Sequence, residues 1–122
     1  MPWPVMRALK SNDMKRLVLT HNEIEGFHRY PGAPAECAYL ADKHRHIFVI
    51  ECAFSVGHNE REIEIITQQG IIEDFISLHW GRPAQFGTMS CESIAQELIE
   101  AFPVMCSCTV KEDGYGGASL TR

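Results

Sequence analysis

Residues 44–56 read HRHIFVIECAFSV and predict the clearest strand of the chain. Side chains of a strand point alternately to its two faces, so every second residue shares a face. One face therefore takes a single set of mostly apolar side chains: His44, His46, Phe48, Ile50, Cys52, Phe54 and Val56. We expect a strand that packs this face on a core, begins with two histidines and ends at Gly57.

The neighbouring stretches predict the remaining elements. Residues 15–29 (KRLVLTHNEIEGFHR) indicate one long strand, and residues 30–36 (YPGAPAE) a loop rich in proline and glycine. A helix is expected around Ile71, Ile72, Phe75 and Ile76, with its start between Glu60 and Gly70. Residues 80–87 (WGRPAQFG) favour a loop, and Ser90 favours the cap of a second helix that Pro103 stops. Residues 104–112 and 118–121 predict two last strands around a turn.

Length and composition favour one globular domain. The chain has 122 residues, of which 45% are hydrophobic and 22% charged, so we expect a loose segment over residues 1–14 and a single domain over residues 15–122. A net charge of −5 argues against a nucleic-acid or membrane surface as partner. No apolar run reaches membrane-span length, and residues 1–13 lack a signal peptide's apolar stretch, so we expect a cytoplasmic protein. Five cysteines without a Cys-x-x-Cys pair indicate no disulfide framework.

Three histidines predict a metal site. His44 and His46 lie two apart on a strand, so both imidazoles can reach one ion. His28 ends the preceding strand, and the loop between the two strands can return the chain beside the pair. Three histidines with an open fourth position are typical of a catalytic Zn²⁺ site. The alternative is that the pair lies at a strand end in water and the third histidine is unrelated.

Three further residues are candidates for chemistry. Cys37, in the loop between the two strands, would become a nucleophile or base near a metal, and is otherwise an ordinary loop residue. Glu112 ends a strand and could bind adjacent N–H groups of a ligand, or could be a solvated strand end. His79 follows the first predicted helix and is a weaker candidate for an acid or base.

Five stretches, in order along residues 16–122, distantly resemble the 6-pyruvoyl-tetrahydropterin and 6-carboxy-tetrahydropterin synthase family, the tunnelling fold. The family's first strand ends in Phe-x-x-x-His, which residues 24–28 (IEGFH) resemble loosely, and its cysteine loop leads to His-Gly-His, as Cys37 leads to residues 44–46 (HRH). Glu64-Ile65 resembles the family's Asp-Phe pair, and Asp74-Phe75 resembles it less closely. Residues 89–95 (MSCESIA) resemble its Pro-Thr-x-Glu-x-x-Ala motif. Residues 110–113 (VKED) resemble its Val-x-Glu-Thr motif.

This resemblance implies an α+β fold: a four-stranded antiparallel sheet with two helices on one face (ββααββ). Subunits would form an oligomeric barrel, as a homo-oligomeric trimer or hexamer with sites between subunits. It implies that zinc on His28, His44 and His46 polarises substrate oxygens, that a cysteine moves protons and that a glutamate anchors the pterin ring. By position the last two are Cys37 and Glu112.

The chain also departs from the family pattern. Cys37 lies farther from the histidine pair than the family's cysteine does, and Leu78-His79 stands where the family has Leu-Asp-His. A histidine base without its carboxylate partner is poorly oriented.

Two functions follow as hypotheses. In the first, a zinc-binding, pterin-synthase-like protein acts on a pterin or purine-like small molecule, as a carbon–oxygen lyase. In the second, a non-catalytic binder sequesters a purine or nucleotide-derived ligand between subunits. A structural oligomer whose histidines bind nothing is a third alternative.

Overall fold

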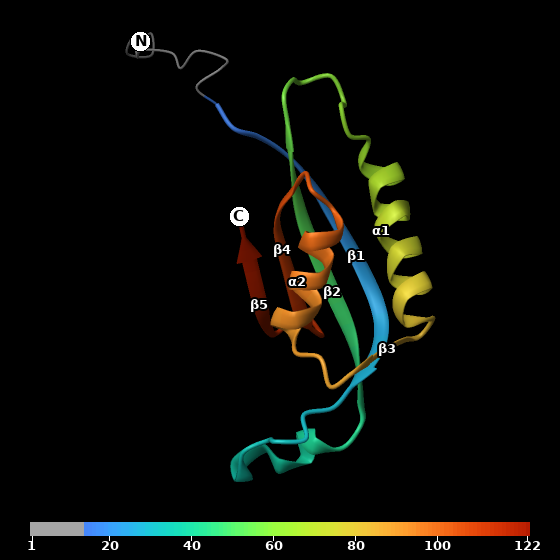
Figure 1. The fold of residues 1–122 in the computed structure, drawn as a ribbon, viewed down its shortest axis with the longest axis vertical. Helices are drawn as coiled ribbons and strands as arrows, with labels where there is room; N and C mark the ends of the chain where they lie inside the picture. The colour runs from blue at the N-terminus through green and yellow to red at the C-terminus, as the bar shows by residue number, and fades with distance from the viewer. Residues whose placement is uncertain (1–13) are drawn as a thin grey trace, which may run out of the picture.

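The structure, a computed structural model, describes residues 14–122. The loose segment expected over residues 1–14 therefore lies almost wholly outside the described residues. Along the chain come β1 (Arg16–His28), a 3₁₀ helix (Ala35–Ala41), β2 (His44–Val56), α1 (Ile65–Trp80), β3 (Ala84–Gly87), α2 (Cys91–Ala101), β4 (Met105–Glu112) and β5 (Gly116–Thr121). Figure 1 shows the strands side by side, with α1 and α2 on one face of the sheet.

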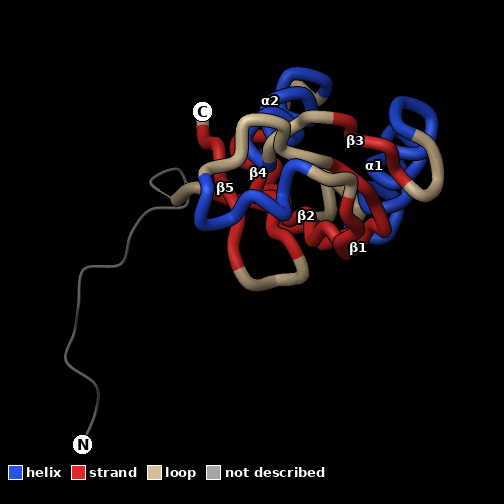
Figure 2. The backbone as a smooth tube through the Cα atoms, turned by 90° about the horizontal axis from the view of Figure 1, so that it is seen from below, coloured by secondary structure: helices blue, strands red, loops and turns tan. Residues whose placement is uncertain are grey.

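The sheet has five strands in the order β3-β1-β2-β4-β5. β1 and β2 pair antiparallel over their full lengths, from Arg16 opposite Val56 to His28 opposite His44. β2–β4 and β4–β5 are also antiparallel, whereas β3 lies parallel to the end of β1. The view from below in Figure 2 shows the two α-helices on the same side of the sheet.

The expected four-stranded antiparallel sheet with two helices is therefore wrong. The described residues form a five-stranded mixed sheet, two α-helices and one 3₁₀ helix. The difference arises in residues 80–87, which were expected to be a loop. After α1 the chain returns beside the end of β1, and there Ala84 pairs with Gly26. This pairing partner is distant in sequence, so the local pattern does not contain it.

The core lies between the helices and the face that the alternation of β2 predicts. Phe48, Ile50 and Phe54 are fully buried there, against apolar residues of both α-helices. Burial of such side chains is the main favourable contribution to folding, about 1.5–3 kcal/mol each. The predicted alternation of residues 44–56 is confirmed by this burial.

Both α-helices begin at capping side chains. Ser90 accepts a hydrogen bond from the Ser93 N–H and caps α2, as expected. Glu64 accepts from the second and third N–H groups of α1, so that helix begins at Ile65 and continues through Gly70. No helix in residues 14–122 is long and apolar enough to cross a membrane.

Candidate metal centre

The three predicted histidines meet at one end of the sheet. His28 lies opposite His44 in the β1–β2 pairing, and His46 lies opposite Gly26. Their rings approach edge to face, with centroid distances of 4.6 Å (His28–His44), 4.9 Å (His44–His46) and 5.3 Å (His28–His46). One nitrogen from each ring lies within 4.8 Å of the other two, so the three residues can hold a metal ion. The strand register thus produces the cluster that the sequence predicts.

Each imidazole is oriented by a hydrogen bond at Nδ1. The Nδ1 of His28 is 2.9 Å from the Met89 carbonyl oxygen, and that of His44 is 2.8 Å from the Asp42 carbonyl oxygen. A carbonyl oxygen only accepts hydrogen bonds, so in both rings Nδ1 donates its proton. The unprotonated Nε2 is then free to bind a metal, and such outer partners are usual for metal-binding histidines.

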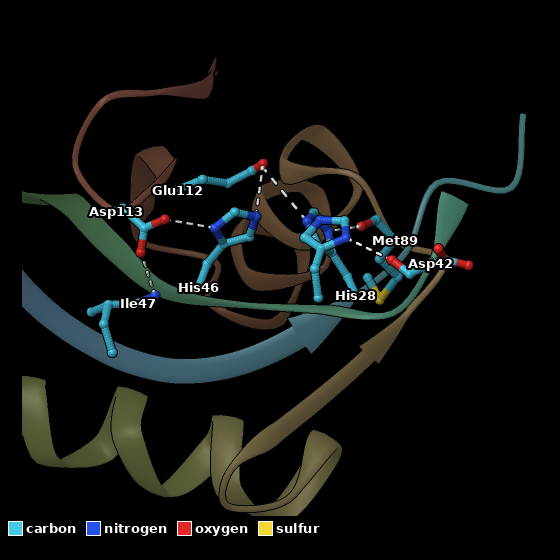
Figure 3. Close-up of polar contacts among 8 residues, drawn as sticks. His28, Asp42, His46, Ile47, Met89, Glu112 and Asp113 are labelled. Atoms are coloured by element: carbon cyan, nitrogen blue, oxygen red, sulfur yellow. Dashed lines mark hydrogen bonds and ion pairs between the residues drawn. The ribbon is translucent and has the colours of Figure 1, made fainter. Parts of the chain in front are cut away.

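His46 has a carboxylate as its partner. Its Nδ1 donates to Asp113 Oδ2 at 2.6 Å, and Asp113 Oδ1 accepts the Ile47 N–H at 2.8 Å, as Figure 3 shows. These two hydrogen bonds, the one from Ile47 first, lower the pKa of the Asp113 carboxyl. Asp113 thereby fixes both the ring orientation of His46 and the backbone next to it.

The remaining nitrogens show that the site fits a cation. The Nε2 atoms of His28 and His46 are buried and have no hydrogen-bond partner among the described residues. Leaving a buried polar atom unpaired costs about 1–3 kcal/mol, so such atoms call for an explanation. Bound metal would satisfy both atoms.

The lowered pKa of His28 also favours metal binding. His28 is only 8% exposed, and burial lowers its pKa, against the opposing effects of the Met89 hydrogen bond and the Glu112 charge. Burial disfavours the charged imidazolium. The neutral imidazole, which is the metal-binding form, is therefore favoured.

Two buried phenylalanine rings pack against the histidine cluster and against each other. The Phe48 ring packs edge to face against His28 at 5.1 Å and His46 at 5.6 Å. Phe86 of β3 packs in turn against Phe48, at 4.8 Å. Both phenylalanines are buried, so the histidines lie on the close-packed core rather than on a mobile loop.

The structure brings Glu112 to the cluster. Its carboxylate oxygens lie 3.6 Å from the Nε2 atoms of His28 and His46. Glu112 is the last residue of β4 and pairs with Phe48, which places it over the same end of the sheet.

The two predicted catalytic residues lie in the 3₁₀ helix between β1 and β2 and in α1. Cys37 is half-buried in the 3₁₀ helix, and His79 is exposed in the last turn of α1, stacked on Phe75 at 4.0 Å. No described contact joins either of them to the three histidines. A cavity of about 590 Å³ lies at the far end of the β1–β2 hairpin, where Arg16 pairs with Val56.

The outer partners of the histidines were not predicted. Two of them are backbone carbonyls, of Asp42 and Met89, and no side-chain pattern can reveal a carbonyl acceptor. The third, Asp113, follows the predicted Glu112 directly, but its sequence context (EDGYGG) indicates a turn.

Neither models of known protein families nor curated protein sequences give a match to this chain. The resemblance to the pterin synthase family therefore rests on the residue pattern alone.

Proposed function

We propose that this chain binds one Zn²⁺ through the Nε2 atoms of His28, His44 and His46, and that the metal centre takes a pterin or purine-like small molecule as its ligand. The observation that supports this proposal is the convergence of three imidazoles whose Nδ1 atoms are already hydrogen-bonded. Three nitrogen ligands suit zinc, whereas magnesium and calcium prefer oxygen.

Zinc binding requires only a small movement of the three imidazole rings. Two ligand atoms that share a tetrahedral zinc at 2.0–2.1 Å lie about 3.4 Å apart. Nitrogens within 4.8 Å of one another reach that spacing by modest side-chain rotation. Because hydrogen bonds at Nδ1 already exclude most other ring orientations, little entropy is lost when the ion binds.

The class of ligand is supported by the resemblance and by Glu112. Zinc in such a site supplies Lewis-acid polarisation of a ligand oxygen. Beside it, a carboxylate can accept hydrogen bonds from ring N–H groups of a pterin or purine.

One observation favours the non-catalytic binder over the lyase. Lyase chemistry needs groups that move protons, and a general base must come within hydrogen-bond reach of its proton, directly or through one water. His79, one of the candidates for that role, stacks on Phe75 and has no carboxylate partner among the described residues, so nothing there orients it as a base. We therefore propose binding as the primary function and carbon–oxygen lyase activity as the second candidate.

Metal analysis tests the zinc centre. Protein purified without chelator should hold about one zinc per chain, and His44→Ala or His46→Ala should remove it. His21→Ala is the matched control, because His21 lies on β1 but is exposed and pairs with Glu23. Wild-type protein that neither retains zinc nor takes it up on titration would refute the proposal.

Ligand assays then separate the two functions. The zinc-loaded protein should bind a pterin or a purine in equilibrium measurements, and His46→Ala should lose that binding. Turnover of dihydroneopterin triphosphate that is abolished by Cys37→Ala would establish the lyase instead. A zinc protein that binds neither class of ring would retain the metal centre and refute the class of ligand.

A further inference from the structure

The carboxylate of Glu112 lies between two of the proposed ligand atoms. Its Oε2 is 3.6 Å from His28 Nε2 and its Oε1 is 3.6 Å from His46 Nε2. Figure 3 shows the side chain reaching over the sheet end toward both rings. The residue is held there by the strand pairing of β4 with β2.

The distance distinguishes two kinds of contact. Hydrogen bonds from nitrogen to oxygen measure about 2.7–3.2 Å, so neither approach is one. Two atoms bound to the same tetrahedral zinc, with Zn–N of 2.0–2.1 Å and Zn–O of 2.0–2.2 Å, lie about 3.3–3.5 Å apart. Each carboxylate oxygen therefore lies, at 3.6 Å, close to the separation of neighbouring ligands on one ion from one of the two histidine nitrogens.

The carboxylate has no competing partner. No arginine, lysine or backbone N–H within residues 14–122 contacts its oxygens, and its only described ion-pair partners are the two histidines. Its side chain is 30% exposed, so it is partly withdrawn from water. One bound cation would pair both with this carboxylate and with the unpaired Nε2 atoms of His28 and His46.

We propose that Glu112 is the fourth ligand of the metal, which makes the site His₃Glu rather than His₃ with an open position. This proposal rests on the zinc centre proposed above. Glu112 can then accept ring N–H groups, as the resemblance implies, only after a small molecule has displaced it from the metal. A small molecule then reaches the metal only by displacing the carboxylate, so the resting site is closed.

Metal affinity is the first test. Glu112→Gln keeps the size of the side chain and removes the charged ligand. Zinc affinity, measured by competition with a chelating dye, should fall by more than the 10–100-fold typical for loss of an outer-shell partner. Glu92→Gln is the matched control, because it removes the same charge from the first turn of α2. The control should keep wild-type affinity.

Cobalt spectroscopy tests coordination separately from affinity. Co²⁺ substituted into the wild-type protein should show visible bands that change little on addition of azide, since no position is open. In Glu112→Gln the bands should differ from wild type and shift with azide, because a water then occupies the fourth position.

The outcomes separate the two proposals. If wild type binds zinc and Glu112→Gln matches it in affinity and cobalt spectrum, the His₃Glu assignment is overturned and the histidine centre remains. If wild type binds no zinc, both are overturned. A crystal structure of the zinc-loaded protein provides a check that does not depend on a variant: an oxygen of Glu112 should lie 2.0–2.2 Å from the ion, and a carboxylate turned away from it would contradict the proposal.

Discussion

Replacing Gly26 by alanine should damage both the core and the metal centre. Gly26 lies in β1 between His46 on β2 and Ala84 on β3. A Cβ added there would lie 2.8 Å from Cε2 of Phe86 and 3.0 Å from Cδ2 of Phe48. Carbon atoms in contact normally lie about 3.5–4.0 Å apart, so the two rings must move.

The cost follows from the burial of those rings. Phe48 and Phe86 are 0% and 2% exposed, so neither ring can move outward into solvent. Adding a methyl group to a packed core typically costs 1–3 kcal/mol. With two buried rings displaced by one atom, we expect about 2–3 kcal/mol, or roughly 10 °C in Tm for a domain of this size. Zinc affinity should also fall, because Phe48 supports the rings of His28 and His46.

Urea denaturation followed by circular dichroism measures this change. Gly70→Ala is the matched control: Gly70 lies inside α1, and a Cβ there has no neighbour within 4 Å. That variant should be more stable than wild type by about 0.5–1 kcal/mol, because glycine is a poor helix former. If Gly26→Ala unfolds at the wild-type midpoint or above it, the packing argument is refuted.

Three further predictions concern the site and its surroundings. Asp113→Ala should weaken zinc binding by about 10–100-fold in dye competition, because His46 loses its outer partner; unchanged affinity would exclude that role. Ser90→Ala should lower the free energy of unfolding by about 1 kcal/mol, since α2 loses its cap; a urea midpoint equal to wild type would contradict it. In native protein a thiol reagent should label at most Cys37 and Cys106, the two cysteines that are not buried, and rapid labelling of all five without denaturant would show that the core is open.

The strands and histidines were predictable because their signals are local. Alternation over residues 44–56 identified β2 and its buried face, and the same alternation placed His44 and His46 together. The prediction that His28 lies beside His44 and His46 required only that two successive strands form a hairpin. The strand register then confirmed the interpretation, with His28 opposite His44.

The remaining features depend on contacts that are distant in sequence. β3 has four residues and forms only where the end of β1 offers a free edge. The start of α1 was uncertain because Gly70 weakens the helical pattern, whereas Glu64 caps the helix further upstream. His79 looked like an acid or base from its place after a helix, but it stacks on Phe75 in the last turn of α1.

The proposed ligands come from three strands, and this arrangement bears on how the protein folds and unfolds. β1 and β2 are neighbours in the chain, so His28 can meet His44 early, whereas Glu112 arrives only when β4 has docked on β2. An unfolded chain therefore does not present the complete ligand set, and the proposed zinc ion would bind the native state preferentially. Interactions completed after the folding transition state slow unfolding and leave the folding rate nearly unchanged. If β4 docks on β2 after that transition state, zinc at this sheet end would prolong the lifetime of the folded chain without hastening its formation.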